Sequence, residues 1–331
     1  MKESPALLPF ACALAGAIIS LSGLPGVAGE VEVTKTDEAI RFEIDGKLFT
    51  EWRIADWDVP YLYPVIGPHG VNVTRHYPMK EGVEHEQTDH PHHRSIRFSH
   101  RGINGYSFWA PHPTREGGDA KIVLDRVESM TSGKTGEVVM HNRWLGGGEL
   151  VLEERLRLAV TPLPDGEVLL DYDTTLTANG GTDAHFVDQK DGGLGVRVAG
   201  TMKVSDRETG EGDGVIVNSH GDRDEAAWGK RAEWADYSGP DPSGEIAGIA
   251  IFDHPDNLRF PTHWHARTYG LITANRFGTG YFEAKSGAKV GDGDYVLEAG
   301  ETMTLKHRIY IHRGDAESAK VAERYRAYAG K

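Results

Sequence analysis

The 331-residue sequence predicts an all-β protein, a large two-sheet antiparallel β-sandwich with one C-terminal helix. Several segments alternate apolar and polar residues with the period of two that a half-buried strand requires. Two of these segments flank Asp45-Gly46, a pair that is typical of a two-residue hairpin turn. The connections between the predicted strands lack the helical period of a crossover helix, and this disfavours a parallel α/β fold.

The clearest strands are the two arms of this hairpin, residues 40–44 and 47–52. Two longer strands are predicted over residues 150–160 and 167–176. Strands of about ten residues exceed the usual ~5 to 6 and indicate a large antiparallel sandwich in which each sheet keeps one face in water. Further strands are predicted at residues 121–127, 137–144, 196–203, 245–252, 267–274 and 302–311.

One helix is predicted over residues 316–329. Asp315 can serve as its N-cap, and Val321, Tyr325 and Tyr328 recur at helical spacing. We expect this helix to pack outside the sandwich.

Two glycine-rich segments, residues 146–148 and 192–195, are predicted to be turns, since no helix follows that could receive a phosphate. Long polar connections are predicted at residues 60–97, 204–244 and 255–265. Connections of this length are uncommon in compact domains and are usually functional.

Residues 1–29 have the layout of a secretory signal peptide, because Lys2 precedes a short apolar run and small residues stand ahead of Glu30. The run is short for a membrane span, and no later stretch approaches the ~18 to 20 apolar residues that a span requires. We therefore expect residues 30–331 to form a single β-sandwich domain that is periplasmic or secreted and has no membrane anchor. The only cysteine, Cys12, lies in the predicted signal, so the mature chain would have no thiolate or disulfide chemistry.

The net charge of -14 is unchanged by removal of the predicted signal, because Lys2 and Glu3 cancel. An acidic surface repels nucleic acid and anionic lipid. We expect a small-molecule or oligosaccharide substrate as the partner and no nucleic acid.

The densest cluster of ionisable groups is the run Asp89-His90-Pro91-His92-His93-Arg94-Ser95-Ile96-Arg97. Pro91 disfavours helical backbone at the residue before it, so at least the start of this run is predicted to be extended. In extended backbone alternate side chains share a face. This spacing predicts His90 and His92 on one face and Asp89 and His93 on the other.

A second run, His263-Trp264-His265-Ala266-Arg267, repeats the His-x-His spacing and the arginine two residues later. A single pair of this kind is more often a solvated loop or a satisfied core group than a site. Two pairs in a chain with 16 histidines favour a functional site instead. If the pairs form one site, they must face one another across a pocket.

The aromatic residues near these runs could pack on sugar rings while polar groups bind hydroxyls, although about half of them are expected in the core. Residues 188–197 form a third polar cluster, which by itself is typical of a charged turn. The predicted catalytic residues are His92, His93, His263, His265, Asp188 and Lys190. The predicted substrate-binding residues are Arg75, Arg94, Trp109, Arg197, Arg267, Tyr269 and Asn275.

A set of motifs in this order resembles the bacterial family that is labelled "methane oxygenase PmoA". The motifs are Arg75-His76-Tyr77-Pro78-Met79, the run from Asp89 to Ile96, Asn104-Gly105 with Phe108-Trp109, Trp234-Ala235-Asp236-Tyr237-Ser238-Gly239, Asp253-His254-Pro255-Asp256-Asn257, and the run from His263 to Gly270 with Asn275 and Gly278. The resemblance covers most of the mature chain. It implies a galactose-mutarotase-like β-sandwich, or supersandwich, from bacteria that degrade polysaccharides. It implies no catalytic residues, so the site residues rest on the sequence pattern.

Three functions are compatible with these residues. The first is an exported carbohydrate-active enzyme, a hydrolase, lyase or epimerase, that uses histidine as general acid and base without a cofactor. The second is a metal-dependent enzyme in which His90, His92, His263 and His265 bind a divalent transition metal. The third is a sugar-binding sandwich without catalysis. The dominance of imidazole over carboxylate favours proton abstraction or epimerisation over plain hydrolysis.

Overall fold

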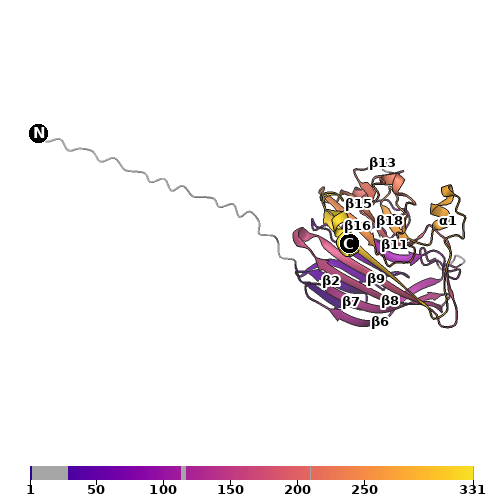
Figure 1. Cartoon of the computed structure of the whole chain (residues 1–331). Coiled ribbons are helices and arrows are strands. Elements are labelled where there is room, and N and C mark those ends of the chain that lie inside the picture. Colours follow the sequence, from indigo (N-terminus) through magenta and orange to yellow (C-terminus); the bar gives the residue numbers. More distant parts are fainter. Residues whose placement is uncertain (2–28, 113–116, 209, 331) are drawn as a thin grey trace.

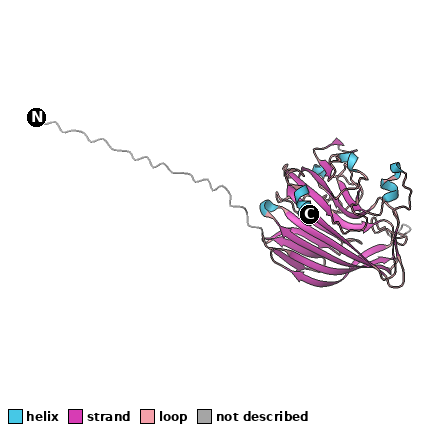
Figure 2. Ribbon diagram, viewed as in Figure 1, coloured by secondary structure: helices cyan, strands magenta, loops and turns pink. Residues whose placement is uncertain are grey.

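The computed structural model of the protein describes Met1 and residues 29–112, 117–208 and 210–330. The predicted signal peptide therefore lies largely outside the described residues. Two large antiparallel sheets pack face to face, and short helical segments lie at the periphery (Figures 1 and 2). This arrangement confirms the predicted two-sheet antiparallel sandwich. Within the described residues, no helix has the length and apolar character that crossing a membrane requires.

The first sheet has eight strands, and its central strands come from distant parts of the chain. Their spatial order is β1 (Val31–Lys35), β2 (Ala39–Ile44), β3 (Lys47–Arg53), β4 (Tyr61–Val65), β5 (Ile96–His100), β11 (Gly192–Arg197), β18 (Leu271–Asn275) and β17 (His263–Trp264). The first histidine run leads into β5, and the second begins at β17, which pairs with β18. Because β11 pairs with both β5 and β18, the two runs lie on the same part of this sheet.

The second sheet also has eight strands, several of them long. Their order is β14 (Val215–Asn218), β15 (Trp234–Pro240), β16 (Ile246–Asp253), β20 (Thr302–Arg313), β9 (Val168–Ala178), β8 (Glu149–Pro162), β7 (Gly136–Gly146) and β6 (Ala120–Thr131). Two small sheets pair β10 (Ala184–Phe186) with β19 (Tyr295–Leu297), and β12 (Ser205–Asp206) with β13 (Gly210–Glu211). The helical segments are α1 (Thr279–Phe282), α2 (Val321–Tyr328) and the 3-10 turns η1 (Pro164–Gly166), η2 (Gly200–Met202), η3 (Asp224–Ala227) and η4 (Ala284–Ser286).

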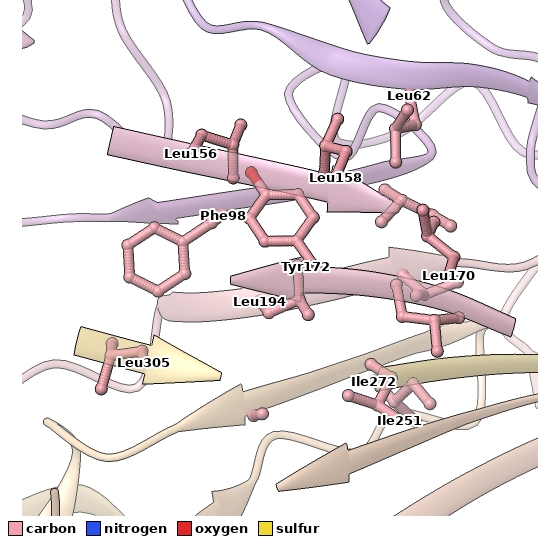
Figure 3. Packing of buried hydrophobic residues seen from close by; sticks show 14 of the residues in the cluster. Leu62, Phe98, Leu156, Leu158, Leu170, Tyr172, Leu194, Ile251, Ile272 and Leu305 are labelled. Atoms are coloured by element: carbon pink, nitrogen blue, oxygen red, sulfur yellow. The ribbon is translucent and has the colours of Figure 1, made fainter. Parts of the chain in front are cut away.

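The core lies between the two sheets and is filled by alternate residues of their strands. Leu156 of β8 and Tyr172 of β9 meet Phe98, Leu194 and Ile272 of the first sheet in one buried cluster (Figure 3). Every second residue of β9 is buried, as the period of a strand with one covered face requires. Burial of these side chains supplies the main favourable term for folding.

The opposite face of the central strands β5, β11 and β18 is also buried, because loops cover it. On this face lie the residues between the core positions, including Arg97 of β5, Arg197 of β11 and Thr273 of β18. Arg97 donates to the carbonyl oxygen of Trp109, in the loop after β5. Arg197 donates to the side chain of Gln87, in the loop before β5. The polar loops on either side of β5 therefore cover this face of β5 and β11.

The predicted hairpin is confirmed, with φ angles of 49° at Asp45 and 73° at Gly46 between β2 and β3. The predicted strands at residues 121–127, 137–144, 150–160, 167–176, 245–252 and 302–311 are confirmed as β6, β7, β8, β9, β16 and β20. The predicted loops 60–97, 204–244 and 255–265 each contain strands, namely β4 and β5, β12 to β15, and β17.

The prediction of a turn at residues 192–195 is wrong, because these residues form most of the buried strand β11. A Cβ atom on Gly193 would lie 1.9 Å from the carbonyl oxygen of Ala274, and one on Gly192 would lie 2.2 Å from Nδ1 of His100. Glycine here permits close packing between strands rather than a reversal of the chain. The predicted strand at 196–203 accordingly ends at Arg197, and the one at 267–274 begins only at Leu271.

The C-terminal helix is confirmed but is shorter than predicted, since α2 begins at Val321. Asp315 caps a preceding turn instead of the helix, with its Oδ1 accepting from the backbone N–H of Ser318 at 2.9 Å. Tyr325 and Tyr328 pack against Phe252 at centroid distances of 5.7 and 6.0 Å. The helix thus covers the outer face of the second sheet, in a cluster separate from the main core.

Candidate functional site

A pocket of about 1050 Å³ lies among six segments on the loop-covered side of the first sheet. They are the loop before β5, the loop after β5, the residues just before β11, the β12–β13 hairpin, the turn η3 with Glu225, and the segment between β17 and β18. Strands β5, β11 and β18 are neighbours, so their ends bring segments together that are far apart in the sequence.

The two histidine runs converge in this pocket, but not with all their members. His90, His92 and His93 line it together with His265. His263 lies outside it, because its Nε2 binds Glu283 Oε1 at 2.7 Å and its ring packs against Phe282. The predicted convergence of the two His-x-His pairs therefore holds for His265 and not for His263.

The loop before β5 folds as a turn, which corrects the predicted extended geometry. His90 has a φ of 41°, and the N–H of His93 donates to the carbonyl oxygen of His90 at 2.9 Å. His90 consequently stacks on His93, with ring centroids 4.7 Å apart, instead of sharing a strand face with His92. We call residues 89–93 the histidine loop.

Arg75 explains why the histidine loop adopts this turn. Its guanidinium group donates to the carbonyl oxygens of Asp89, His90 and His93 at 2.9, 2.7 and 3.1 Å. It also donates to the Asp89 carboxylate at 2.9 Å, and the side chain is 1% exposed. The predicted substrate-binding role of Arg75 is not supported by this position, since the guanidinium is occupied in holding the loop.

Asp89 and His90 form a hydrogen-bonded pair between Oδ2 and Nδ1. The other carboxylate oxygen accepts from Arg75 at 2.9 Å and from Arg197 at 3.3 Å. Burial alone would raise the pKa of Asp89, but the hydrogen bond from His90 and the charges of Arg197 and Arg75 lower it to about 2. Asp89 is therefore ionised at neutral pH, and it orients an imidazole that remains 45% exposed.

The other histidines of the pocket are neutral at neutral pH. Burial, with the nearby charge of Arg97, lowers the pKa of His92 to about 3. Burial also lowers the pKa of His93 well below its usual value, and that of His265 to about 3 although the Asp191 carboxylate acts to raise it. A neutral imidazole can accept a proton, which a protonated one cannot.

Asp191 is the second carboxylate of the pocket, and it lies beside His265. Lys190 Nζ binds its Oδ1 at 2.8 Å, and Arg101 Nη1 binds its Oδ2 at 2.9 Å. Burial would raise the pKa of Asp191, but Lys190 and Arg101 lower it. His265 Nδ1 lies 4.0 Å from Oδ1 and has no hydrogen-bond partner among the described residues. The Asp191 carboxylate thus offsets only part of the effect of burial on the pKa of His265.

Three predicted substrate-binding residues do line the pocket, namely Trp109, Arg267 and Tyr269. Tyr269 stacks on His90 at a centroid distance of 5.6 Å, and Trp109 meets His93 edge-on at 5.3 Å. These rings and the histidines form a continuous aromatic wall. The guanidinium of Arg267 lies over Tyr269 at 5.4 Å and is exposed.

Four other predicted residues hold the scaffold around the pocket. Asp188 accepts backbone N–H groups of Gly280, Gly291 and Gly293 at 2.9, 2.9 and 3.2 Å. Asn275 donates to the carbonyl oxygen of Gln189 at 2.8 Å. Arg94 lies over the ring of Trp57 at 4.7 Å and does not line the pocket. Arg197 lies beneath the pocket, bound to Asp89 and 4.5 Å from the Tyr269 ring centre.

Sequence reasoning did not select Asp89, Asp191 or Arg101 as site residues, and it missed the β12–β13 hairpin that contributes Asp206 and Glu211 to the pocket. Asp89 and Asp191 each stand next to a selected residue, so adjacency was an available signal. The hairpin carries no motif that could have identified it. Among the residues that the structure describes, no group of three or more His, Cys, Asp or Glu side chains is arranged to hold a metal ion.

Comparison with curated proteins found no match for this chain. Among solved structures, one described as a polysaccharide lyase is similar to it, with 11% sequence identity and a TM-score of 0.29 over 87% of this chain and 33% of that one. The chain thus spans about one third of the length of that protein. The model of a family of unknown function, DUF6807, matches residues 39–326, and the chain belongs to this family.

Proposed function

We propose that this protein is a carbohydrate-active enzyme in which histidine side chains move protons to and from a sugar. The observation that carries the proposal is the convergence of two histidine–carboxylate arrangements, Asp89 with His90 and Asp191 with His265, on one aromatic-walled pocket. A titratable group held by an oriented partner in a cleft is the usual arrangement of a general base or acid.

His90 is the better candidate for the general base. Its Nδ1 is bound to Asp89, so Nε2 is the ring nitrogen that is free to meet a substrate. The anchored carboxylate fixes the ring and stabilises the positive charge that develops when Nε2 takes a proton. His265, which burial keeps neutral in the resting protein, would act as the partner group that carries a proton only during turnover, with the nearby Asp191 carboxylate favouring that form.

The walls of the pocket suit a sugar. Trp109 and Tyr269 contribute aromatic surface to the pocket wall, while Arg101, Lys190 and Arg267 offer donors for hydroxyl oxygens. The volume of about 1050 Å³ is at the upper end of ordinary ligand pockets, and it fits an oligosaccharide.

The proposed reaction class is elimination or epimerisation. The two carboxylates that lie beside the pocket histidines, Asp89 and Asp191, are bound by cationic side chains, which disfavours either of them as the proton donor that glycoside hydrolysis by two carboxyl groups requires. In either reaction the base would take a proton from a ring carbon, and in an epimerisation a proton would return to the same carbon from the opposite face. In an elimination the conjugate acid would then give a proton to the departing glycosidic oxygen.

The test is incubation with a panel of plant and algal oligosaccharides, followed by mass analysis of the products. Hydrolysis adds one water to the summed product mass, elimination adds none and leaves a double bond, and epimerisation preserves both mass and chain length. His90→Ala and His265→Ala should lose turnover, while His220→Ala, an exposed histidine outside the pocket, should retain it. Sugar binding without any product would support the binding-module alternative. Loss of turnover with a chelator would support the metal alternative.

We also propose that the protein is exported after removal of residues 1–29, since the apolar run and the small residues ahead of Glu30 form a signal peptide pattern. Intact-mass measurement should find a native chain that begins near Glu30; a retained Met1 or Lys2 would contradict it.

We further infer that the methane-oxygenase label does not describe this chain, because a polar pocket of about 1050 Å³ suits a polar ligand much larger than methane.

A further inference from the structure

The histidine-lined part of the pocket has more cationic side chains than carboxylates. Asp89 and Asp191 each bind two cationic groups at distances of 2.8 to 3.3 Å. These groups are Arg75 and Arg197 at Asp89, and Lys190 and Arg101 at Asp191. One carboxylate balances one cation, so a surplus of positive charge remains beside both carboxylates.

Arg267 adds a further positive charge, and it forms no ion pair with a carboxylate among the residues that the structure describes. Its guanidinium lies over the ring of Tyr269 at 5.4 Å, and Tyr269 stacks on His90. The Arg267 side chain is exposed and lines the pocket, two residues from His265. An anionic ligand group can therefore bind Arg267 without displacing a carboxylate of the protein.

Two of these cations are close enough to act on a histidine of the pocket. Burial is the main cause of the low pKa of His265, and the charges of Lys190 and Arg267 lower this pKa further, against the opposing effect of Asp191. A ligand group that meets the His265 imidazole therefore lies within the electrostatic reach of Lys190 and Arg267.

The proposed chemistry itself requires a group that accepts electrons. A ring carbon that gives its proton to a base keeps the electron pair of the broken bond. The carboxylate of a uronic acid is bonded to such a carbon and can take up the pair as an enediolate, whereas a neutral sugar ring has no such group. A sulfate ester is attached through oxygen and cannot take up the pair either. The enediolate has one more negative charge than the substrate, so cations at the carboxylate stabilise it more than they stabilise the substrate.

We propose that the substrate is a uronate whose carboxylate binds Arg267, with Lys190 and Arg101 contributing further positive charge. This inference rests on the proposed function, because it names the substrate class of the same site. His90 Nε2 takes the proton from the carbon next to the carboxylate, and the carboxylate takes the electron pair. In an elimination the pair then forms a double bond to the neighbouring ring carbon, whose bond to the glycosidic oxygen breaks, and this oxygen takes a proton from the conjugate acid. In an epimerisation the proton returns to the first carbon from the opposite face.

The β12–β13 hairpin and η3 give another part of the pocket the opposite charge. Asp206 is paired with Lys203 at 2.6 Å. Three exposed glutamates line the pocket there against one exposed arginine, Arg207; the glutamates are Glu208, Glu211 and Glu225. Like charges weaken the binding of a second carboxylate at this position. We therefore expect a single uronate flanked by neutral sugars to bind better than a polyuronate.

The experiment uses plant and algal oligosaccharides that each carry one uronate, before and after chemical reduction of the carboxylate to an alcohol. Sulfated neutral oligosaccharides form the third arm. Calorimetry on His90→Ala measures binding, and mass analysis of wild-type reactions in heavy water detects an unsaturated product or a gain of deuterium. We expect the uronates to bind roughly 10- to 100-fold more tightly than their reduced forms, and only the uronates to react.

The outcomes separate this inference from the proposed function. Reaction of the reduced or sulfated sugars as fast as the uronates would overturn the uronate assignment and leave the proposed function intact. Selective binding of the uronates without an unsaturated product or deuterium would contradict the proposed function and leave uronate recognition in place. Binding of the uronates no tighter than that of their reduced forms would overturn the inference.

Variants locate the recognition of the carboxylate. Arg267→Gln should lower the affinity for the uronate by roughly 10- to 100-fold and leave the affinity for the reduced form unchanged. Arg126→Gln, at an exposed arginine on β6, should change neither affinity. Because Arg267 is exposed, its replacement should leave the fold intact, which thermal unfolding checks. An equal loss of affinity for both sugars in Arg267→Gln would show that Arg267 does not bind the carboxylate.

Discussion

His90 Nδ1 is hydrogen-bonded to Asp89 Oδ2, and the second oxygen of the same carboxylate is bound by Arg75 and Arg197. The two members of the pair are adjacent in sequence, but the arginines that fix them come from positions far upstream and downstream. Arg197 ends β11, and Arg75 is tied to the same point by a hydrogen bond from its backbone N–H to the Arg197 carbonyl oxygen. The sheet thereby holds the imidazole in place before any ligand binds, which is the preorganisation that proton transfer requires.

Asp89→Asn should therefore reduce turnover, and it should also lower the stability of the fold, because the buried Arg75 and Arg197 lose their carboxylate partner. The amide retains the size of the carboxylate but cannot stabilise a protonated His90. We expect a loss of roughly 10²-fold or more in kcat, in the range found for general acid–base groups. The measurement is steady-state kinetics on the substrate that the oligosaccharide panel identifies, with His220→Ala as the matched control. An unchanged kcat in Asp89→Asn would remove the Asp89–His90 pair from the mechanism.

Stability should fall as the pH falls from about 6.5. The pKa values of His92 and His265 are lowered from 6.5 to about 3 in the folded protein, so the unfolded chain binds protons first as the pH decreases. The contribution of these two histidines to the free energy of unfolding is complete above a pH of about 6.5, and it is lost progressively as the pH falls toward about 3. Each group can contribute up to about 1.4 kcal/mol per pH unit within this window.

The measurement is urea unfolding at several pH values between about 7.5 and 5. His265→Gln should fold less stably at neutral pH but show a shallower decline with pH than the wild type. His312 acts in the opposite direction, because Asp236 raises its pKa despite burial, and its contribution is lost as the pH rises. A free energy of unfolding that declines as steeply with falling pH in His265→Gln as in the wild type would contradict the neutral state of His265.

The long strands and the hairpin were predictable because their signals are local in sequence, namely the alternation of apolar and polar residues and the turn-forming pair Asp45-Gly46. Strands β8 and β9 bury every second residue along much of their length, and β2 and β3 turn at a dipeptide with positive φ at both positions. Strand β11 escaped prediction because its glycines are required by neighbours, His100 and the Ala274 carbonyl, that are distant in sequence. The conformational freedom of glycine, which suggests a turn, was overridden by tertiary packing.

The candidate site was predictable only as a set of chemical groups. The histidine runs identified His90, His92, His93 and His265, and composition identified Trp109 and Tyr269 as aromatic partners. Their spacing could not show that Arg75 folds the first run into a turn, since the contacts are made by carbonyl oxygens. Nor could it show that His263, two residues from His265, would bind Glu283.

Arg75→Met should destabilise the fold, in contrast to the sequence-based expectation that Arg75 binds substrate. Its removal leaves three carbonyl oxygens and part of the Asp89 charge without this partner. Loss of a buried, hydrogen-bonded charge typically costs about 3 to 5 kcal/mol. Arg267→Ala, at an exposed position over Tyr269, should change stability by less than about 0.5 kcal/mol and weaken substrate binding instead.

Denaturant unfolding and substrate titration of both variants separate the two roles. The combination expected is a large loss of stability in Arg75→Met and a raised KM with near-normal stability in Arg267→Ala. Full stability of Arg75→Met would show that the histidine loop does not depend on this anchor.

Gly193→Ala should disrupt the strand that connects the two halves of the pocket. Gly193 lies on β11 between Asp191 and Arg197 and has a φ of 87°, and a Cβ atom added to it would lie 1.9 Å from the Ala274 carbonyl oxygen. The backbone conformation alone costs roughly 1 to 2 kcal/mol for a residue other than glycine, and the contact with backbone can be relieved only by separating β11 from β18.

Gly181→Ala is the matched control, because a Cβ there meets nothing within 4 Å. Denaturant unfolding should place Gly193→Ala at least about 2 kcal/mol below the wild type and Gly181→Ala close to it. Equal stability of the two variants would mean that β11 and β18 can move apart at little cost, and the placement of Asp191 and Arg197 by close strand packing would then be wrong.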